Sequence, residues 1–259
     1  MKRHFYPLLV LLSLASCEIT NLREGMFAEP VPCHVESILT NIGRISINEE
    51  YGTPEISNIT ESVEAEYFNI SVLTFDSLIG WNGEDLGFRT GIGQGIIASE
   101  GTYCEESIPE VEQHIHNWVK EQNENSEPLW DVSWNTHTRT NCYYFPYRLE
   151  GVTALMITAN QPFNGIEAGK DITKCFAIGQ SSPSLIFSYD DYSVYTSVWG
   201  KKTSISEWLA LRPLASPCIL LCLTDEAMEA ASNIAFTITM TLTNGKVLTD
   251  TTPTANLLK

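Results

Sequence analysis

Residues 235–242, Ala-Phe-Thr-Ile-Thr-Met-Thr-Leu, carry the clearest strand pattern in the chain, because apolar residues alternate with threonines. In a β-strand this alternation places every apolar side chain on one face and every threonine on the other. The dipeptide Asn244-Gly245 follows, and it favours a type I′ hairpin turn because both residues tolerate left-handed backbone conformations. Val247-Leu248 then begins a return strand. The stretch predicts an antiparallel sheet with one face packed on a core and the other facing water.

Further strand patterns lie upstream of this hairpin. Residues 62–75 alternate between apolar and acidic positions and then change phase, which predicts a strand interrupted by a bulge. Residues 35–47 predict two short strands that are joined by a turn at residues 40–43. Residues 152–158 and 219–223 are apolar runs that predict buried strands.

Two capping boxes predict helices among these strands. Ser107 precedes Glu110 by three residues, and apolar residues at helical spacing follow, so we expect a helix over residues 107–122. Ser204 and Glu207 repeat this pattern in front of a short helix. Many strands with two or three short inserted helices predict a mainly-β fold, an antiparallel β-sandwich.

The N-terminus has the order of a secretory signal. A positive start precedes the apolar residues 8–12 and the small-residue motif Leu14-Ala15-Ser16-Cys17. The apolar run is too short to span a bilayer, which takes roughly 20 apolar residues. The motif resembles the lipobox of bacterial lipoproteins. This resemblance implies a signal peptide at residues 1–16 and a lipid, such as palmitate, on Cys17.

The chain after the signal peptide divides into two regions between residues 32 and 33, where a strand-like pattern begins. Residues 17–32 contain Gly25, Pro30 and Pro32 and show no sustained periodicity, so we expect a flexible tether. Residues 33–259 are expected to form a single β-rich domain, whose length is sufficient to bury its own core.

The chain resembles envelope lipoproteins of Bacteroidetes, because a lipobox precedes a domain that ends in a threonine-rich hairpin. Residues 1–17 and 204–258 carry this resemblance. It implies an immunoglobulin- or transthyretin-like sandwich, attachment of the protein to the outer membrane through its lipid, and no catalytic residues. Both the periplasmic face and the cell surface stay open as locations.

Charge restricts the partners. The chain has 15 Lys and Arg against 32 Asp and Glu, a formal net charge of −17. Removal of Lys2 and Arg3 with the signal would lower this charge to −19. Such a surface repels nucleic acid, so the expected partners are the membrane, through the lipid, and a glycan or another envelope protein.

Six cysteines remain besides Cys17, an even number for an exported protein. The sequence leaves their disulfide pairing open. Cys218 and Cys222 lie in an apolar run and are expected to behave as small buried hydrophobic residues. No second close pair completes a zinc site with them, so we expect no metal. The six cysteines are Cys33, Cys104, Cys142, Cys175, Cys218 and Cys222.

Catalytic motifs are missing from the chain. Neither Gly-x-Ser-x-Gly nor His-Glu-x-x-His occurs, and adjacent acids on a strand face opposite ways, whereas a glycosidase needs two carboxylates in one cleft. The acidic pair Asp190-Asp191 could bind Ca²⁺, but we favour the interpretation that it is a solvated acidic loop. We therefore expect a protein that is not an enzyme and has no cofactor.

Clustered aromatic residues are the best sequence lead to a ligand site. Tyrosine and tryptophan on a sandwich surface can stack on sugar rings, whereas the same residues in the core would serve packing alone. Exposure distinguishes the two interpretations. The candidate stacking residues are Tyr143, Tyr144, Tyr147, Tyr189, Tyr192 and Trp199.

Three functions agree with this sequence. The first is a lipid-anchored, non-catalytic cell-envelope protein with a binding or assembly role. The second is a carbohydrate-binding accessory protein or a polysaccharide-active enzyme. The third is a fimbria-like surface subunit, which would exchange a strand at a sheet edge, and residues 255–259 are the expected edge.

Overall fold

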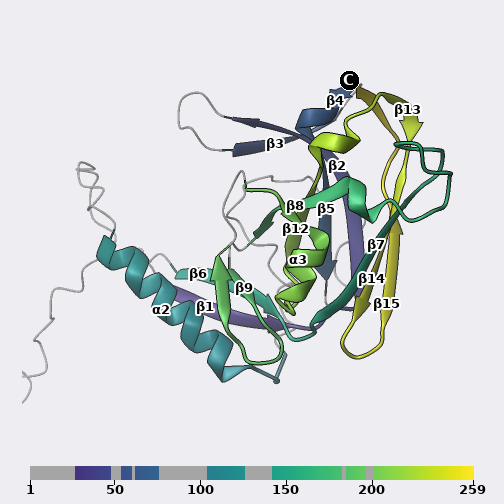
Figure 1. Ribbon diagram of the computed structural model, residues 1–259. Coiled ribbons are helices and arrows are strands. Elements are labelled where there is room, and N and C mark those ends of the chain that lie inside the picture. The colour runs from purple at the N-terminus through teal and green to yellow at the C-terminus, as the bar shows by residue number, and fades with distance from the viewer. Residues whose placement is uncertain are drawn as a thin grey trace, which may run out of the picture.

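The computed structural model describes residues 27–47, 54–59, 62–75, 104–125, 142–182, 185–196 and 201–259. The predicted fold class is confirmed: these residues form a mainly-β protein with a β-sandwich at its centre and two α-helices (Figure 1).

One layer of the sandwich is a six-stranded sheet in which all neighbouring strands are antiparallel. The predicted turn at residues 40–43 is wrong, because β2 (Ser37–Ile47) runs through it as one strand and pairs with β5 (Phe68–Phe75) from Ser37 to Arg44. In order across the sheet, the strands are β11 (Thr203–Ser204), β8 (Phe176–Ser182), β12 (Cys218–Leu223), β5 (Phe68–Phe75), β2 (Ser37–Ile47) and β3 (Pro54–Asn58).

The facing layer contains β15 (Val247–Thr251), β14 (Phe236–Leu242) and β7 (Val152–Ala159), again antiparallel. The alternation in β14 is confirmed: its apolar residues are buried and its threonines face outward, where two of them contact threonine hydroxyls of β15. The hairpin also forms as expected. The predicted type I′ turn is wrong, however. Such a turn needs a positive φ at both Asn244 and Gly245, and of these two only Gly245, with a φ of 83°, has one.

The C-terminal strand β16 (Ala255–Leu258) lies in the middle of a third, three-stranded sheet. It is antiparallel to β13 (Ala231–Ile234) and parallel to β4 (Val63–Glu64). The 3₁₀ helix Ala65–Tyr67 separates β4 from β5, where the sequence predicted a bulge. The expectation of an edge strand at residues 255–259 is therefore wrong, since both sides of β16 are paired.

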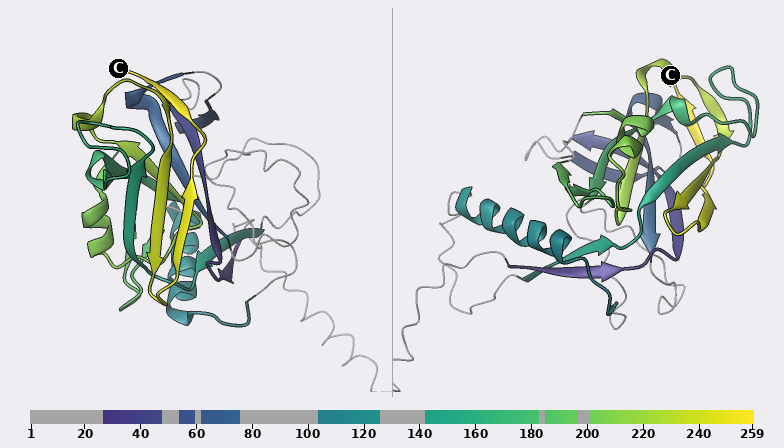
Figure 2. Two further views of the ribbon diagram at one scale, coloured as in Figure 1. Left: turned by 90° about the vertical axis from the view of Figure 1, so that its right-hand side faces the viewer. Right: turned by 60° about the horizontal axis from the view of Figure 1, so that its bottom comes forward.

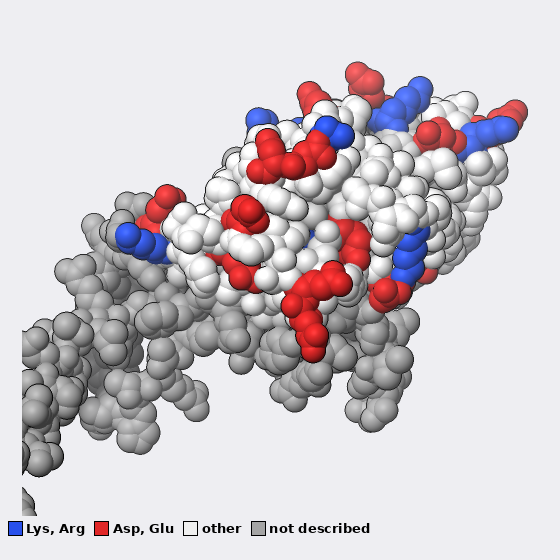
Figure 3. Space-filling model, turned by 90° about the horizontal axis from the view of Figure 1, so that it is seen from below, with Lys and Arg blue, Asp and Glu red and all other residues white. Residues whose placement is uncertain are grey.

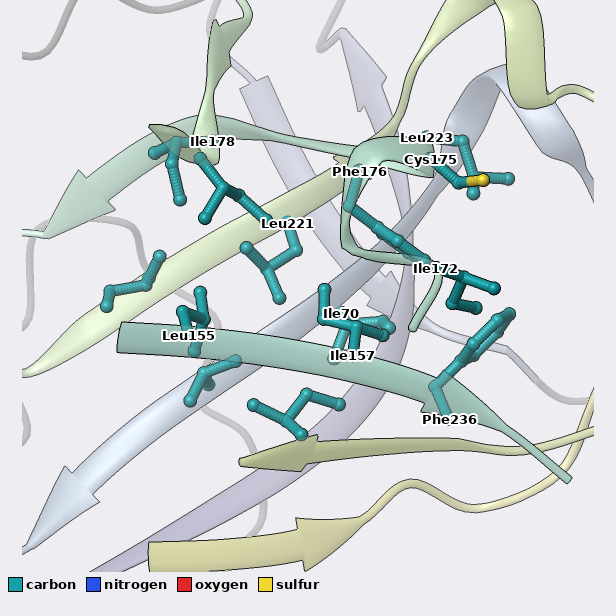
Figure 4. Close-up of a cluster of buried hydrophobic side chains, with 14 of the residues drawn as sticks. Ile70, Leu155, Ile157, Ile172, Cys175, Phe176, Ile178, Leu221, Leu223 and Phe236 are labelled. Atoms are coloured by element: carbon teal, nitrogen blue, oxygen red, sulfur yellow. The ribbon is translucent and has the colours of Figure 1, made fainter. Parts of the chain in front are cut away.

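Phe236 lies at the centre of the core between the layers. Its ring centroid is 5.7 Å from that of Phe68, 5.7 Å from that of Phe163 and 5.2 Å from that of Phe176. Figure 4 shows Phe236 among aliphatic side chains that both layers contribute, including Ile157 of the facing layer. Because every one of these residues is buried, their packing couples the two layers.

A smaller unit packs beside the sandwich. It consists of the parallel strands β1 (Phe27–Cys33) and β6 (Cys142–Arg148), with helix α2 (Pro109–Asn125) alongside them (Figure 2). Its own apolar cluster includes Val111 and Ile115 of α2 and residues of β9 (Leu185–Phe187). The predicted tether is therefore wrong from residue 27 onward, while residues 17–26 lie outside the described residues.

The second predicted helix is confirmed as α3 (Ile205–Ala210), with both hydrogen bonds of its capping box at Ser204 and Glu207. Helix α2 also forms, but it begins two residues after Ser107. No helix in the described part of the chain combines the length and the apolar character that would let it span a membrane.

Asp250 of β15 connects the facing layer to β2. Its Oδ2 atom accepts hydrogen bonds from the backbone N of Thr40 at 2.6 Å and from the Thr40 hydroxyl at 2.8 Å. Thr40 is buried, so its amide needs this acceptor. Strand β3 pairs only with residues 43–47 of β2 and does not reach Thr40. The Asp250 carboxylate therefore supplies the acceptor that the Thr40 amide needs.

We predict that Asp250→Ala lowers the free energy of unfolding by about 1–3 kcal/mol, because a buried amide loses its acceptor. Asp250→Asn keeps an acceptor oxygen in the same place and should retain most of that stability. Urea unfolding at neutral pH compares the two variants. Equal losses in both would contradict the role given to this hydrogen bond.

Candidate functional site

The structure separates the predicted stacking residues. Cys17 and Trp199 lie outside the described residues. Tyr143 and Tyr144 lie in β6, at the register positions of Ala28 and Glu29 of β1. Only Tyr147, Tyr189 and Tyr192 have side chains whose surroundings can be examined.

Tyr147 is buried and cannot stack on a ligand, so this part of the site prediction is wrong. Its hydroxyl accepts a hydrogen bond from the backbone N of Ile108 and donates one to Glu112, both at 3.0 Å. The hydroxyl therefore fixes the first turn of α2. Burial, the largest effect, raises the pKa of Tyr147 above its ordinary value.

Tyr189 and Tyr192 lie in the connection between β9 and β10 (Val194–Thr196), which form an antiparallel hairpin. Asp191 shapes this connection, because its Oδ1 atom accepts hydrogen bonds from Ser193 N at 3.0 Å and from Ser193 Oγ at 2.7 Å. These bonds lower the pKa of Asp191. We call Tyr189, Asp190, Asp191, Tyr192, Val194, Tyr195 and Arg212 the hairpin surface.

The Tyr189 ring is held by neighbours from two distant segments. The Arg212 guanidinium carbon lies 5.5 Å from the ring centroid, a distance typical of a cation–π contact. Arg212 also forms an ion pair with Asp190, and its carbonyl accepts a hydrogen bond of 2.7 Å from Tyr189 N. Gly151 approaches the ring so closely that a Cβ atom there would be 2.2 Å from Tyr189 Cδ1. Tyr189 therefore offers little free ring surface to a sugar.

Two residues of the hairpin surface have left-handed backbone conformations: φ is 55° at Tyr192 and 54° at Arg212. Side chains of this size rarely adopt such angles, and each costs on the order of 1–3 kcal/mol. Hydrogen bonds hold Arg212 in place, because its N donates to Leu209 O at 2.9 Å and its O accepts from Tyr189. Strain of this kind is concentrated at functional sites, which singles out this surface.

Exposed groups lie next to the strained ones. The side chain of Arg212 is 57% exposed, while Tyr195 is 40% and Val194 is 39% exposed. The Ser193 and Tyr195 hydroxyls are 3.2 Å apart and share a hydrogen bond that orients the Tyr195 ring. The hairpin surface thus exposes a fixed cation, a phenol and an aliphatic side chain, with Tyr195 and Val194 on opposite faces of strand β10.

Sequence reasoning missed Arg212 and Val194. No local sequence pattern singles out Arg212, because its position over Tyr189 depends on tertiary structure. The dipeptide Asp190-Asp191 does not form an open Ca²⁺ site here, because Asp190 binds Arg212 and Asp191 binds Ser193. In the described part of the chain, no cluster of His, Cys, Asp or Glu is suited to a metal ion.

Four cysteines are free thiols in the structure: Cys104, Cys175, Cys218 and Cys222. Burial raises the pKa of Cys218 to about 12 and that of Cys222 to about 11. Cys222 is buried as expected, whereas Cys218 is only half-buried. Cys33 is buried as well, and its thiol donates to Val31 O at 3.7 Å. The side chain of Cys142 lies outside what the structure describes.

Comparisons with known proteins found no match: no family model, no curated protein and no solved structure is significantly similar to this chain. The hairpin surface is therefore judged on its own geometry.

We predict that Gly151→Ala disrupts the hairpin surface, because the new Cβ atom would overlap the Tyr189 ring and lie 2.8 Å from Thr243 Cγ2. Overpacking of this kind costs about 1–3 kcal/mol of unfolding free energy. The same substitution in a Tyr189→Ala background should cost less, since the main obstacle is gone. Chemical denaturation of the four proteins measures this coupling, and purely additive losses would contradict it.

Proposed function

We propose that this chain is a lipid-anchored, non-catalytic protein of the cell envelope whose hairpin surface binds a partner in that compartment. The fixed position of Arg212 over Tyr189 supports this proposal, together with the exposed Tyr195 on the adjoining strand β10. Tyrosine and arginine are the residues that most often dominate binding energy at protein interfaces.

Preorganisation supports a binding role. The ion pair with Asp190 and the contact with Tyr189 restrict Arg212 before any partner arrives. Restricting a long side chain in advance reduces the entropy that binding would otherwise cost, which is about 0.5–1.5 kcal/mol for each such side chain. The strained backbone at Tyr192 and Arg212 is explained in the same way, as a cost that the fold bears to hold this geometry.

The geometry favours a protein partner over a glycan. Sugar binding relies on open aromatic faces, and the Tyr189 ring is covered by Arg212 and Gly151. The exposed Arg212 and Tyr195 suit the mixed polar and apolar surface of a protein. Carbohydrate binding is the second candidate, and the exposed ring of Tyr195 is the observation that favours it.

The proposed location in the cell envelope and the proposed lack of catalytic activity are supported by the sequence. Leu14-Ala15-Ser16-Cys17 supports export and acylation, and the resemblance to Bacteroidetes envelope lipoproteins supports an outer-membrane location. A single acyl chain binds a membrane only marginally, so stable attachment would use the several chains that lipoproteins carry. The missing hydrolase and metalloprotease motifs support a role without catalysis.

We predict that Cys17→Ala moves the protein from the membrane fraction to the soluble fraction, because Cys17 is the only proposed site of acylation. Cell fractionation and immunoblotting measure the distribution. Ser16→Ala keeps a small residue at the cleavage site and serves as the control, which should stay with the membrane. Membrane association of the Cys17→Ala protein would contradict the anchor.

We predict that Tyr195→Ala combined with Arg212→Ala abolishes partner binding. The matched control is Tyr67→Ala combined with Arg44→Ala, which removes the same two residue types from a pair 5.3 Å apart on other elements. A photo-cross-linking residue at position 194 and an outer-membrane extract identify a protein partner, and a glycan array tests sugars. Equal cross-linking or array binding by both double variants would contradict the site.

A further inference from the structure

His34 lies where the smaller unit passes into the sandwich. The paired strands β1 and β6 continue into β2 and β7, which belong to opposite layers of the sandwich. Residues 34–36 form the first of these two connections and residues 149–151 the second. The two paired strands therefore enter opposite layers of the sandwich through these connections, and we call residues 34–36 and 149–151 the joint. A change in a side chain at the joint can act on both units.

Glu150 holds His34 at the joint. Its Oε1 atom is 2.7 Å from His34 Nδ1, and its Oε2 atom accepts a hydrogen bond of 2.9 Å from Val35 N. The Glu150 side chain is only 11% exposed. Both carboxylate oxygens thus bind the first connection, so that Glu150 is a fixed partner for the imidazole.

The other side of the imidazole faces the segment that leads into α2. His34 Nε2 is 4.0 Å from Oε2 of Glu106, three residues before the helix begins. Glu36 is a third acid near His34. Lys246, from the β14–β15 turn, forms an ion pair with Glu36. Figure 3 shows the molecule from the side of this turn, where acidic side chains gather.

The two protonation states of His34 differ at Nε2. A neutral imidazole with its proton on Nδ1 donates to Glu150 and turns an unprotonated Nε2 atom toward Glu106. A protonated imidazole keeps the bond to Glu150 and gains an N–H group that points to Glu106. The proton thus adds an attraction to the α2 segment and leaves the bond to Glu150 in place.

We propose that His34 is a proton-operated latch: when both ring nitrogens carry protons, it connects Glu150 at the joint to Glu106 and so holds the segment in front of α2 against the sandwich. This latch is a conformational device that does not depend on the identity of the partner.

The electrostatic surroundings agree with this role. The hydrogen bond to Glu150 is the largest effect on the pKa of His34 and raises it, as do the charges of Glu150, Glu106 and Glu36. Partial burial acts in the opposite direction and is outweighed, so the pKa lies above 6.5. A raised pKa in the folded state means that the latch is complete below about pH 6.5 and is lost as the pH rises through the pKa of His34.

The latch acts on α2 and through it on the hairpin surface. Glu106 precedes Ile108, whose N donates to Tyr147, so the latch and this hydrogen bond hold the same end of the helix. Helix α2 also supports β9, because Phe187 packs in the same apolar cluster as Val111 and Ile115. Loosening the helix at high pH would therefore weaken the support of the hairpin that carries Tyr189.

Hydrogen exchange of the purified protein tests the latch. Protection factors of the α2 amides, corrected for intrinsic exchange, are compared at pH 5.5 and pH 8.5. We expect protection to fall at the higher pH by up to about fivefold, because the proton adds only the exposed contact with Glu106 and leaves the bond to Glu150 in place. His34→Gln should remove this pH dependence, and the matched variant His116→Gln, at an exposed position of α2, should retain it.

A second variant covers the case in which His34→Gln does not fold. Glu106→Gln leaves the bond between His34 and Glu150 intact and removes only the charge that faces Nε2, so it should reduce the pH dependence as well. An NMR titration that places the pKa of His34 at or below 6.5 would overturn the proposal. The same holds if Glu106→Gln shows the pH dependence of the unaltered protein.

Discussion

The packing of Phe236 against three other aromatic rings is the contact on which the rest of the structure depends. Phe68 and Phe176 come from strands of the six-stranded sheet, Phe163 comes from the loop after β7, and Phe236 itself begins β14. This contact therefore joins the two layers within their shared core. The position of β7 follows from this contact, and β7 in turn places Gly151, against which the hairpin surface packs.

Local pattern was sufficient to predict the elements whose own residues determine them. The alternation in residues 235–242 and the Ser204–Glu207 capping box both gave correct predictions, because each depends on neighbours within a few positions. Predictions failed where distant residues decide. Residues 40–43, where a turn was expected, belong to a continuous strand. All four of them pair with β5, and Asp250 accepts a hydrogen bond from Thr40 N. The parallel pairs β1–β6 and β4–β16 have no local signal at all.

The candidate site shows the same division. The aromatic residues around position 190 could be found from composition, but their roles could not. Whether Tyr189 is an open platform or a covered ring depends on Arg212 and Gly151, which are 23 and 38 positions away from it in the sequence. Tyr147 is the clearest example, since a tyrosine in an aromatic run proved to be the buried hydroxyl that fixes α2. Charge and backbone strain, more than aromatic content, distinguish the hairpin surface.

The pairing of β16 with β4 has a consequence for how the protein folds. The last strand of the chain fills the centre of a sheet whose other members begin at residues 63 and 231. Contacts between positions so far apart require a long loop to close, which slows folding. The sheet is incomplete until the final four-residue strand is available.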